Sequence, residues 1–223
     1  MYLARAIIFD MDGTLFQTDK ILEHSLEATF GELRSKGLWT GKAPIETYRD
    51  KMGASLPEVW QALLPHHADS VRAQANDVFH ERLIESILAG EGALYPHVKE
   101  TFEQISQQFA LYIASNGQTE YLAAIVRYYG LDRWIQRTYS IQEINSGNKS
   151  ALVGKIKQNH GITEGMVVGD RLSDIQAAKD NGFISIGCRF DFAQEQELAQ
   201  ADLIIEDLSE LVSYLRSCSS LSI

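Results

Sequence analysis

Two aspartates, Asp10 and Asp12, directly follow an apolar run, and this arrangement constrains the chain more than any other feature. The run at residues 6–9 (Ala-Ile-Ile-Phe) predicts a buried strand, and Gly13 lets the chain turn just beyond its end. Carboxylates are costly to crowd together unless a cation holds them. The pattern therefore predicts, at a strand end, a site for a hard cation and for chemistry on an anion.

Composition and charge limit the class of protein. The 223 residues, 45% hydrophobic and 22% charged, suffice for one large domain or for a core with a smaller insert. The net charge of −10 argues against a nucleic-acid-binding surface, because phosphate backbones need clustered Lys and Arg. A small anionic substrate is compatible with this charge, provided that a metal or local basic groups receive it.

The sequence also predicts the compartment. No basic segment followed by a long apolar stretch stands at the start, and the longest apolar runs fall far short of a membrane span. The two cysteines, Cys188 and Cys218, suit a reducing compartment as free thiols. We therefore expect a cytoplasmic protein without membrane contact, with Cys188 packed inside and Cys218 on a surface tail.

A helical pattern runs from about residue 18 to residue 90. Apolar residues recur at helical spacing in two segments, namely Leu22, Leu26, Phe30 and Leu33, and then Val71, Ala75, Phe79, Leu83 and Ile87. Between them, Ser55 and Glu58 form a predicted capping box around Pro57. No strand pattern interrupts this stretch, so we expect a small helical domain inserted after the first strand.

Beyond residue 94, short apolar runs alternate with helical segments. The runs lie at 109–114, 166–168, 184–186 and 203–205, and the helices near 97–108, 118–129, 149–159, 173–181 and 208–216. Continuous apolar runs are typical of strands buried on both faces, and intervening helices make such strands parallel. We therefore expect a doubly wound, Rossmann-like α/β core of residues 1–16 and 94–217, a helical cap of residues 17–93 and a tail of residues 218–223.

Polar residues gather at the carboxyl ends of the predicted strands, where doubly wound folds bind their ligands. These ends carry Asp10, then Ser115 with Asn116, then Gly169 with Asp170. Asp174 follows four residues further on, and Lys149 opens the helix before the same strand. All of these side chains are therefore expected at one edge of the sheet.

This set resembles the four motifs of the haloacid dehalogenase-like hydrolase superfamily, in order and over essentially the whole chain. The segment 10–15 (Asp-Met-Asp-Gly-Thr-Leu) is similar to the first motif. The other three motifs are matched by Ser115-Asn116, by Lys149, and by Gly169-Asp170 with Asp174. The helical insert resembles the family's small cap, and the chain is most similar to the phosphoglycolate phosphatase-like and β-phosphoglucomutase-like branch.

The resemblance implies a phosphatase that works through an aspartyl-phosphate. Asp10 would be the nucleophile. Asp12 would be the general acid for the leaving alcohol and then the general base for water. We expect Thr14 to hydrogen-bond near Asp12 and fix its direction, and Gly169 to have a similar orienting role. The phosphate oxygens would be bound by Ser115, Asn116 and Lys149.

The resemblance also implies Mg²⁺. A carboxylate that attacks a phosphate dianion faces a repulsion of roughly 4 kcal/mol per charge pair at about 4 Å and an intermediate dielectric. A Mg²⁺ ion that bridges the two reverses the sign of this energy. Asp10 and Asp170 would ligate by side chain and Asp12 by its backbone carbonyl. Asp174 would hold metal-bound water or orient Lys149.

The cap loop is the expected source of specificity. Residues 48–55 resemble the loop that faces the site in related phosphatases. Arg49 or Lys51 would meet a second anionic group, and Gly53 would let the backbone approach the substrate; the alternative is a solvated loop between helices. The histidines on helical segments, namely His24, His80 and His160, are expected to be exposed and not to be ligands.

Two positions depart from the family pattern. Gln17 stands where many relatives have an aspartate, and His97 follows Pro96 where glycine is common. Gln17 lies near the entry into the cap and would affect specificity, but neither residue is expected to touch the nucleophile. We expect the cap to open and close on hinges near residues 16–18 and 90–95.

The sequence favours a Mg²⁺-dependent phosphatase that acts on a small phosphorylated metabolite, and three alternatives stay open. A phosphomutase would return the phosphate to a sugar; Thr14 weighs against it, because mutases often carry an apolar residue there. A haloacid dehalogenase would need no metal, which Asp12 and Asp170 argue against. A non-enzymatic regulatory protein would be expected to have lost a motif residue. The physiological ester and the oligomeric state, monomer or dimer, are not set by the sequence.

Overall fold

Six strands form one parallel sheet in the computed structural model, which describes residues 5–191 and 193–220. The strands are β1 (Arg5–Phe9), β2 (Ala110–Ser115), β3 (Ile135–Ser140), β4 (Glu164–Gly169), β5 (Ile184–Cys188) and β6 (Leu203–Ile205). Their order is β3-β2-β1-β4-β5-β6, so the chain proceeds in one direction from β1 to β3 and in the other from β4 to β6. The predicted doubly wound core is confirmed, and the end of β1 lies at the switch point where such folds bind ligands.

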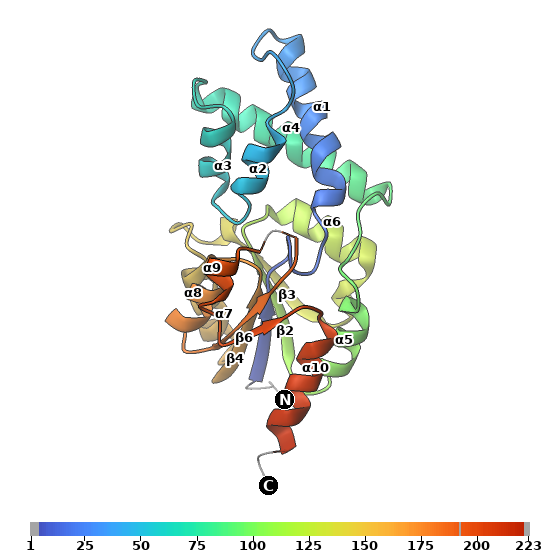
Figure 1. The fold of residues 1–223 in the computed structure, drawn as a ribbon, viewed down its shortest axis with the longest axis vertical. Helices are drawn as coiled ribbons and strands as arrows, with labels where there is room; N and C mark the ends of the chain where they lie inside the picture. Colours follow the sequence, from blue (N-terminus) through green and yellow to red (C-terminus); the bar gives the residue numbers. More distant parts are fainter. Residues whose placement is uncertain (1–4, 192, 221–223) are drawn as a thin grey trace.

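Helices cover both faces of this sheet (Figure 1). One face carries α5 (Val98–Ile105), α6 (Thr119–Tyr129) and α10 (Ser209–Ser220), and the other carries α7 (Lys149–His160) and α8 (Leu172–Asp180). The short α9 (Glu195–Leu198) follows β5. Along β1, Ile7 and Phe9 pack into the first core, whereas Ala6 and Ile8 pack into the second. Because both faces are covered, the strand has no polar alternation.

Four helices stand beyond the carboxyl ends of the strands and form the cap (Figure 1). They are α1 (Asp19–Ser35), α2 (Ile45–Asp50), α3 (Leu56–Leu63) and α4 (Asp69–Leu88). The predicted apolar residues are buried in α1 and α4, apart from Val71, which is partly buried. The predicted capping box is also present, because the Ser55 N–H donates to Glu58 Oε2 at 3.0 Å at the start of α3. No strand lies within residues 19–88, all of which the structure describes.

Strand β3 is the main element that the sequence pattern does not reveal. It lies at the edge of the sheet, where Gln136 and Arg137 are exposed, and so it lacks the continuous apolar run of a buried strand. Two single 3₁₀ turns, Leu131–Arg133 and Ile141–Glu143, flank it.

The chain crosses between core and cap twice, and the two crossings are paired with each other. Phe16 and Leu94 form an isolated antiparallel bridge, and the Gln17 N–H donates to the Ala93 carbonyl at 2.9 Å. The Gln17 side chain, at the position where relatives have an acid, donates from Nε2 to the Leu94 carbonyl at 2.6 Å. The two predicted hinges therefore form one short two-stranded connection.

His97, the second departure from the family pattern, adopts a left-handed backbone conformation with φ 62°. Glycine adopts such a φ without steric cost, which accounts for its frequent use at this position. The His97 ring lies 2.8 Å from an Asp207 carboxylate oxygen and is not among the residues that line the cavity described below.

The remaining expectations concern the membrane, the cysteines and the tail. None of the described helices has both the length and the apolar character that a membrane crossing needs. Cys188 is a buried free thiol, as predicted. The side chain of Cys218 and residues 221–223 lie outside the described part of the chain. The backbone of α10 continues to Ser220, past the predicted start of the tail at 218.

Candidate active site

Charged side chains from three separate segments meet beyond the ends of β1 and β4. Asp10 follows β1, Asp170 follows β4, and Lys149 is the first residue of α7. Lys149 Nζ lies 2.5 Å from Oδ1 of Asp10 and 2.5 Å from Oδ1 of Asp174. The side chains of Asp10, Lys149, Asp170 and Asp174 are all buried. The structure therefore brings together residues that the sequence separates by up to 164 positions, the distance from 10 to 174.

The cluster has an excess of carboxylates. Burial raises the pKa of Asp10 to about 7, and the neighbouring Asp174 and Asp12 add to the rise, while Lys149 opposes it. Burial likewise raises the pKa of Asp170 well above its usual value, and the charge of Asp10 contributes. Although burial opposes it, the two adjacent carboxylates raise the pKa of Lys149. The lysine therefore stays charged, but it neutralises only part of the negative charge.

The acidic residues fit a divalent cation. One oxygen from each of Asp10, Asp170 and Asp174 lies within 4.8 Å of the others, and all three side chains are buried. These donors are carboxylate oxygens, which hard cations such as Mg²⁺ and Ca²⁺ prefer. A cation among them would balance the negative charge that Lys149 leaves over and would lower the raised pKa values of the carboxyl groups. The three carboxylates therefore form a candidate metal site.

The loop after β4 is shaped by close packing of Asp174. A Cβ on Gly169 would lie 2.1 Å from Asp174 Cγ, so only glycine leaves room for this carboxylate. The Arg171 N–H donates to Asp174 Oδ2 at 3.1 Å, which fixes the first turn of α8. Asp174 thus bridges the start of α8 to Lys149.

The second aspartate of the first motif is held differently from the prediction. Asp12 Oδ1 accepts hydrogen bonds from Thr18 Oγ1 at 2.6 Å and from the Tyr121 hydroxyl at 2.5 Å. Burial raises the pKa of Asp12, and these two donors oppose the rise. The expectation that Thr14 orients Asp12 is wrong: the Thr14 hydroxyl donates to Asp170 Oδ1 at 3.0 Å, because the turn at Gly13 directs it toward β4.

The residues at the end of β2 lie on another wall of the same site. Ser115 is buried, and its Oγ accepts the Gly117 N–H at 3.0 Å, which leaves the hydroxyl proton available to a ligand. Asn116 donates from Nδ2 to the Gly53 carbonyl of the cap at 2.9 Å, and its Oδ1 is buried without a hydrogen-bond partner among the described residues. Asn116 therefore contacts the cap loop directly.

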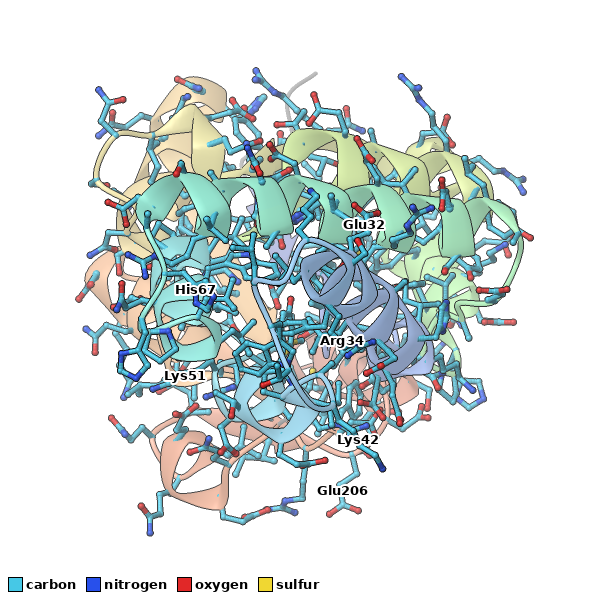
Figure 2. The ribbon with its side chains drawn as sticks, turned by 90° about the horizontal axis from the view of Figure 1, so that it is seen from above. Glu32, Arg34, Lys42, Lys51, His67 and Glu206 are labelled. Carbon is cyan, nitrogen blue, oxygen red and sulfur yellow. The ribbon has the colours of Figure 1, made fainter. Side chains whose placement is uncertain are left out.

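The cap covers the site. The core residues above and the cap together line a cavity of about 60 Å³. The cap side of its wall is mainly apolar and is formed by Thr18, Tyr48, Lys51, Met52, Gly53, Ala54, Leu56, Val59, His80 and Leu83. Viewed from the cap side, α1 and α4 lie across the core, and Lys51 projects from the loop after α2 (Figure 2).

The expectation that His80 is exposed is wrong. Its side chain is buried on the cavity wall, and Nδ1 lies 2.8 Å from the Asn76 carbonyl one helical turn earlier. Because a carbonyl only accepts, Nδ1 carries the proton. Burial lowers the pKa of His80. The imidazole is therefore favoured in its neutral form.

Of the three predicted cap residues, the structure brings two to the cavity. Lys51 and Gly53 line it, whereas Arg49 does not. The Arg49 guanidinium instead pairs with Asp19 at 2.9 Å and with Glu46 at 2.7 Å, within the cap. Arg49 therefore ties α2 to the start of α1.

Arg171, which the sequence reasoning missed, joins core and cap. Its guanidinium donates to the Met52 carbonyl and pairs with Glu197 of α9 at 3.1 Å. Gly53 has φ 83°, and a Cβ there would lie 2.9 Å from Arg171 Cγ. The left-handed turn and the close approach both require glycine at this position. Arg171 and Asn116 thus hold two successive carbonyls of the cap loop.

Comparison with known families agrees with this geometry. A family model described as haloacid dehalogenase-like hydrolase matches residues 4–182 of the chain. The chain belongs to the haloacid dehalogenase-like hydrolases. It is therefore an enzyme of the hydrolase class, and hydrolases of this family generally use a divalent metal, in agreement with the buried carboxylates.

Curated relatives of this hydrolase match it along nearly its whole length. The pyrophosphatase PpaX of Listeria monocytogenes is 24% identical over 220 residues, which cover 94% of this chain and 95% of PpaX. A phosphoglycolate phosphatase of Agrobacterium fabrum is 28% identical over 229 residues, which cover 96% of this chain and 93% of the relative.

Solved structures share the fold of this hydrolase. The structure of a predicted phosphoglycolate phosphatase from Haemophilus somnus has a TM-score of 0.83 and 20% identity, with 94% of this chain and 97% of that chain covered. The structure of CbbY from Rhodobacter sphaeroides in complex with phosphate has a TM-score of 0.79 and 21% identity, with 95% and 96% covered. Both align with core and cap together.

Proposed function

We propose that this haloacid dehalogenase-like hydrolase is a phosphatase that removes the phosphate from a small monoester through a phosphorylated Asp10. One observation carries the proposal: Asp10 lies at the end of β1 in a cavity between core and cap, beside Lys149 and two further buried carboxylates. Relatives that match over nearly the whole chain are named as phosphatases and as a pyrophosphatase. The phosphomutase alternative uses the same nucleophile and differs only in its product.

The two aspartates of the first motif have separate roles in the proposed reaction. An Asp10 oxygen forms a bond to phosphorus while the bond from phosphorus to the ester oxygen breaks, and Asp12 gives a proton to that oxygen. Asp12 then takes a proton from water as the water oxygen bonds to phosphorus. The bond between phosphorus and Asp10 breaks, which releases phosphate and restores both carboxyl groups.

Basic and hydroxyl groups would hold the phosphate oxygens. The Lys149 ammonium lies beside Asp10, where it would approach both the nucleophile and the incoming phosphate. The Ser115 hydroxyl and the Asn116 backbone border the same cavity. Preorganised donors of this kind stabilise the charge that develops in the transition state.

Mg²⁺ is the proposed metal. Asp10 and Asp170 would hold it by their side chains and Asp12 by its backbone carbonyl, with Asp174 beside them. When bound, the ion would offset the repulsion between the nucleophilic carboxylate and the phosphate. Thr14 would keep the Asp170 carboxylate aligned for this task through its hydrogen bond.

The cap would select the substrate. Lys51 and Gly53 remain the candidates for contact with the part of the ester beyond the phosphate, because both line the cavity. Arg49 is engaged by two acids elsewhere in the cap and is not proposed for this role. We also propose that residues 17–93 move as one cap on residues 1–16 and 94–217. The cytoplasmic location and the oligomeric state stay predictions from the sequence.

A panel of phosphate esters tests the function. The purified protein is incubated with Mg²⁺ and with phosphoglycolate, pyrophosphate, nucleotides, sugar phosphates and p-nitrophenyl phosphate, and free phosphate is measured. We expect release from at least one ester, its loss on chelation of the metal, and its loss in Asp10→Asn. Release by Asp10→Asn at the wild-type rate, or none by the wild type, would contradict the proposal. An isomeric sugar phosphate without free phosphate would identify a mutase instead.

A further inference from the structure

The carboxyl group of Asp12 is held from two sides at a single oxygen. Oδ1 accepts the hydroxyl of Thr18 at 2.6 Å and the hydroxyl of Tyr121 at 2.5 Å. Both donors are only 3% exposed, and both line the cavity that contains Asp10. The phenol of Tyr121 is not part of any motif that the sequence suggested.

This arrangement determines where Asp12 carries its proton. A carboxyl oxygen has two lone pairs, and the two hydroxyl donors occupy both lone pairs of Oδ1. The proton of the acid form therefore belongs on Oδ2. A general acid works only when its proton points at the oxygen that receives it, so fixing the proton to one oxygen directs its delivery.

The two donors come from different parts of the molecule. Thr18 directly precedes α1, the first helix of the cap, whereas Tyr121 lies in α6 of the core. The Tyr121 ring belongs to the buried apolar cluster and lies edge-on to His80, with ring centroids 6.1 Å apart. The phenol is thus a donor on a core helix, whereas Thr18 lies at the entry into the cap.

We infer that Tyr121 is a positioning residue that holds Asp12 in place for proton transfer to and from the reacting oxygen. This inference rests on the proposed function and adds a role for a side chain outside its motifs. Tyr121 does not exchange a proton itself. Its hydroxyl directs Oδ2 of Asp12, first toward the leaving oxygen and then toward the attacking water.

Leaving-group dependence separates this role from a merely structural one. p-Nitrophenolate leaves without a proton, whereas the much more basic phenolate needs one from the general acid. The value of kcat/KM reports the reaction up to the departure of the leaving group, so it isolates the acid step. We therefore compare kcat/KM for p-nitrophenyl phosphate and phenyl phosphate, with Mg²⁺, in the wild type and in Tyr121→Phe, which keeps the packed ring.

The matched control is Tyr129→Phe. Tyr129 lies in the same helix, and its buried hydroxyl has no hydrogen-bond partner among the described residues. We expect Tyr121→Phe to lower kcat/KM for phenyl phosphate by about tenfold, part of the 10²–10⁴ that general acids contribute. For p-nitrophenyl phosphate we expect a loss of less than about threefold, and Tyr129→Phe should leave both values unchanged.

Three outcomes would overturn the inference. Equal losses of kcat/KM for the two esters, with a lower melting temperature, would assign Tyr121 a structural role. Unchanged values in Tyr121→Phe would show that Thr18 suffices to hold Asp12. If the wild type releases phosphate from neither ester, while Asp10→Asn and chelation have no effect on any ester of the panel, the proposed function fails and this inference fails with it.

Discussion

The core half and the cap half of the cavity wall are built in different ways. On the core side, the charged residues follow buried strands or begin a helix beside them, and they contact one another directly, as Lys149 does with Asp10 and Asp174. On the cap side, the wall is mainly apolar and comes from several helices and one loop. The core wall therefore carries the groups suited to chemistry, and the cap wall is suited mainly to shaping the cavity, excluding water and selecting the substrate.

This comparison predicts that loss of a charge at the strand ends acts on turnover, and that loss of a contact between the core and the cap loop acts on substrate binding. If residues at the strand ends carry out the reaction, removal of a charge there lowers kcat. A cap that only closes changes the fraction of molecules competent to bind, and therefore the apparent affinity. The following variants test this division.

The largest effect is expected for Lys149→Met. Removal of the ammonium leaves Asp10 and Asp174 without their shared cation and removes a donor for the phosphate, so kcat/KM should fall at least about 100-fold. Phosphate release with Mg²⁺ measures the effect. Lys155→Met is the control, because Lys155 lies in the same helix, pairs with Glu143 at 3.5 Å and does not line the cavity. Activity of Lys149→Met within tenfold of the wild type would refute the central role of this lysine.

A smaller effect, on KM, is expected for Arg171→Met. This change removes the core side chain that holds the Met52 carbonyl, so the closed cap is less populated. KM should rise about tenfold, with kcat changed less than about twofold. Arg189→Met is the control, because Arg189 pairs with Glu195 and Glu206 at the surface and does not touch the cap loop. A fall in kcat at constant KM would contradict a purely closing role.

Gly53→Ala and Gly41→Ala form a matched pair within the cap. Both glycines have positive φ, 83° and 90°, so both variants should lose about 1 kcal/mol of stability in urea unfolding. Only at Gly53 would the new Cβ meet Arg171, whereas nothing lies within 4 Å at Gly41. KM should therefore rise severalfold in Gly53→Ala alone. Equal KM values in the two variants would show that the close approach to Arg171 is unimportant.

The smallest effect is expected for His80→Asn, which should change how the free energy of unfolding depends on pH. Burial lowers the pKa of His80 in the folded state, so the unfolded chain binds more protons just below the ordinary histidine pKa of about 6.5. The contribution of the neutral His80 ring to the free energy of unfolding is therefore fully present above that pH. It is lost as the pH falls toward the pKa of His80 in the folded state. Asparagine keeps the donor to Asn76 but does not titrate. Urea unfolding from pH 7.5 to pH 5 should show a weaker decline in the variant; parallel curves would contradict this.

The same contrast between core and cap explains what the sequence can predict. The charged residues of the core follow strands whose apolar runs are visible, and parallel strands bring their ends to one edge. Asp10, Asp170 and Lys149 can therefore be placed together from the amino-acid sequence alone. Edge strand β3 could not be predicted from the sequence, because its exposed Gln136 and Arg137 interrupt the apolar run that marks a buried strand.

The cap wall could not be predicted in the same way. Helical periodicity identifies a buried face but does not say whether that face meets another helix or a cavity. His80 lies beside Phe79 of the buried stripe and follows no motif, so its position on the cavity wall depends on how α4 packs over α6. Three further contacts join residues that lie 6 to 119 positions apart, so no local sequence pattern predicts them. They are made to Asp12 by Thr18 and Tyr121, and to the Met52 carbonyl by Arg171.

The paired crossings at Gln17 and Ala93 would also set the direction of the proposed cap movement. Both connections leave the core on the side of α5, whereas the loop that carries Met52 and Gly53 lies over α8 and α9 (Figure 1). A lid joined along one margin pivots about that margin, and the far margin moves most for a given rotation. A rotation at the pivot would therefore separate the Met52 and Gly53 carbonyls from Arg171 and Asn116 and would widen the cavity on that side.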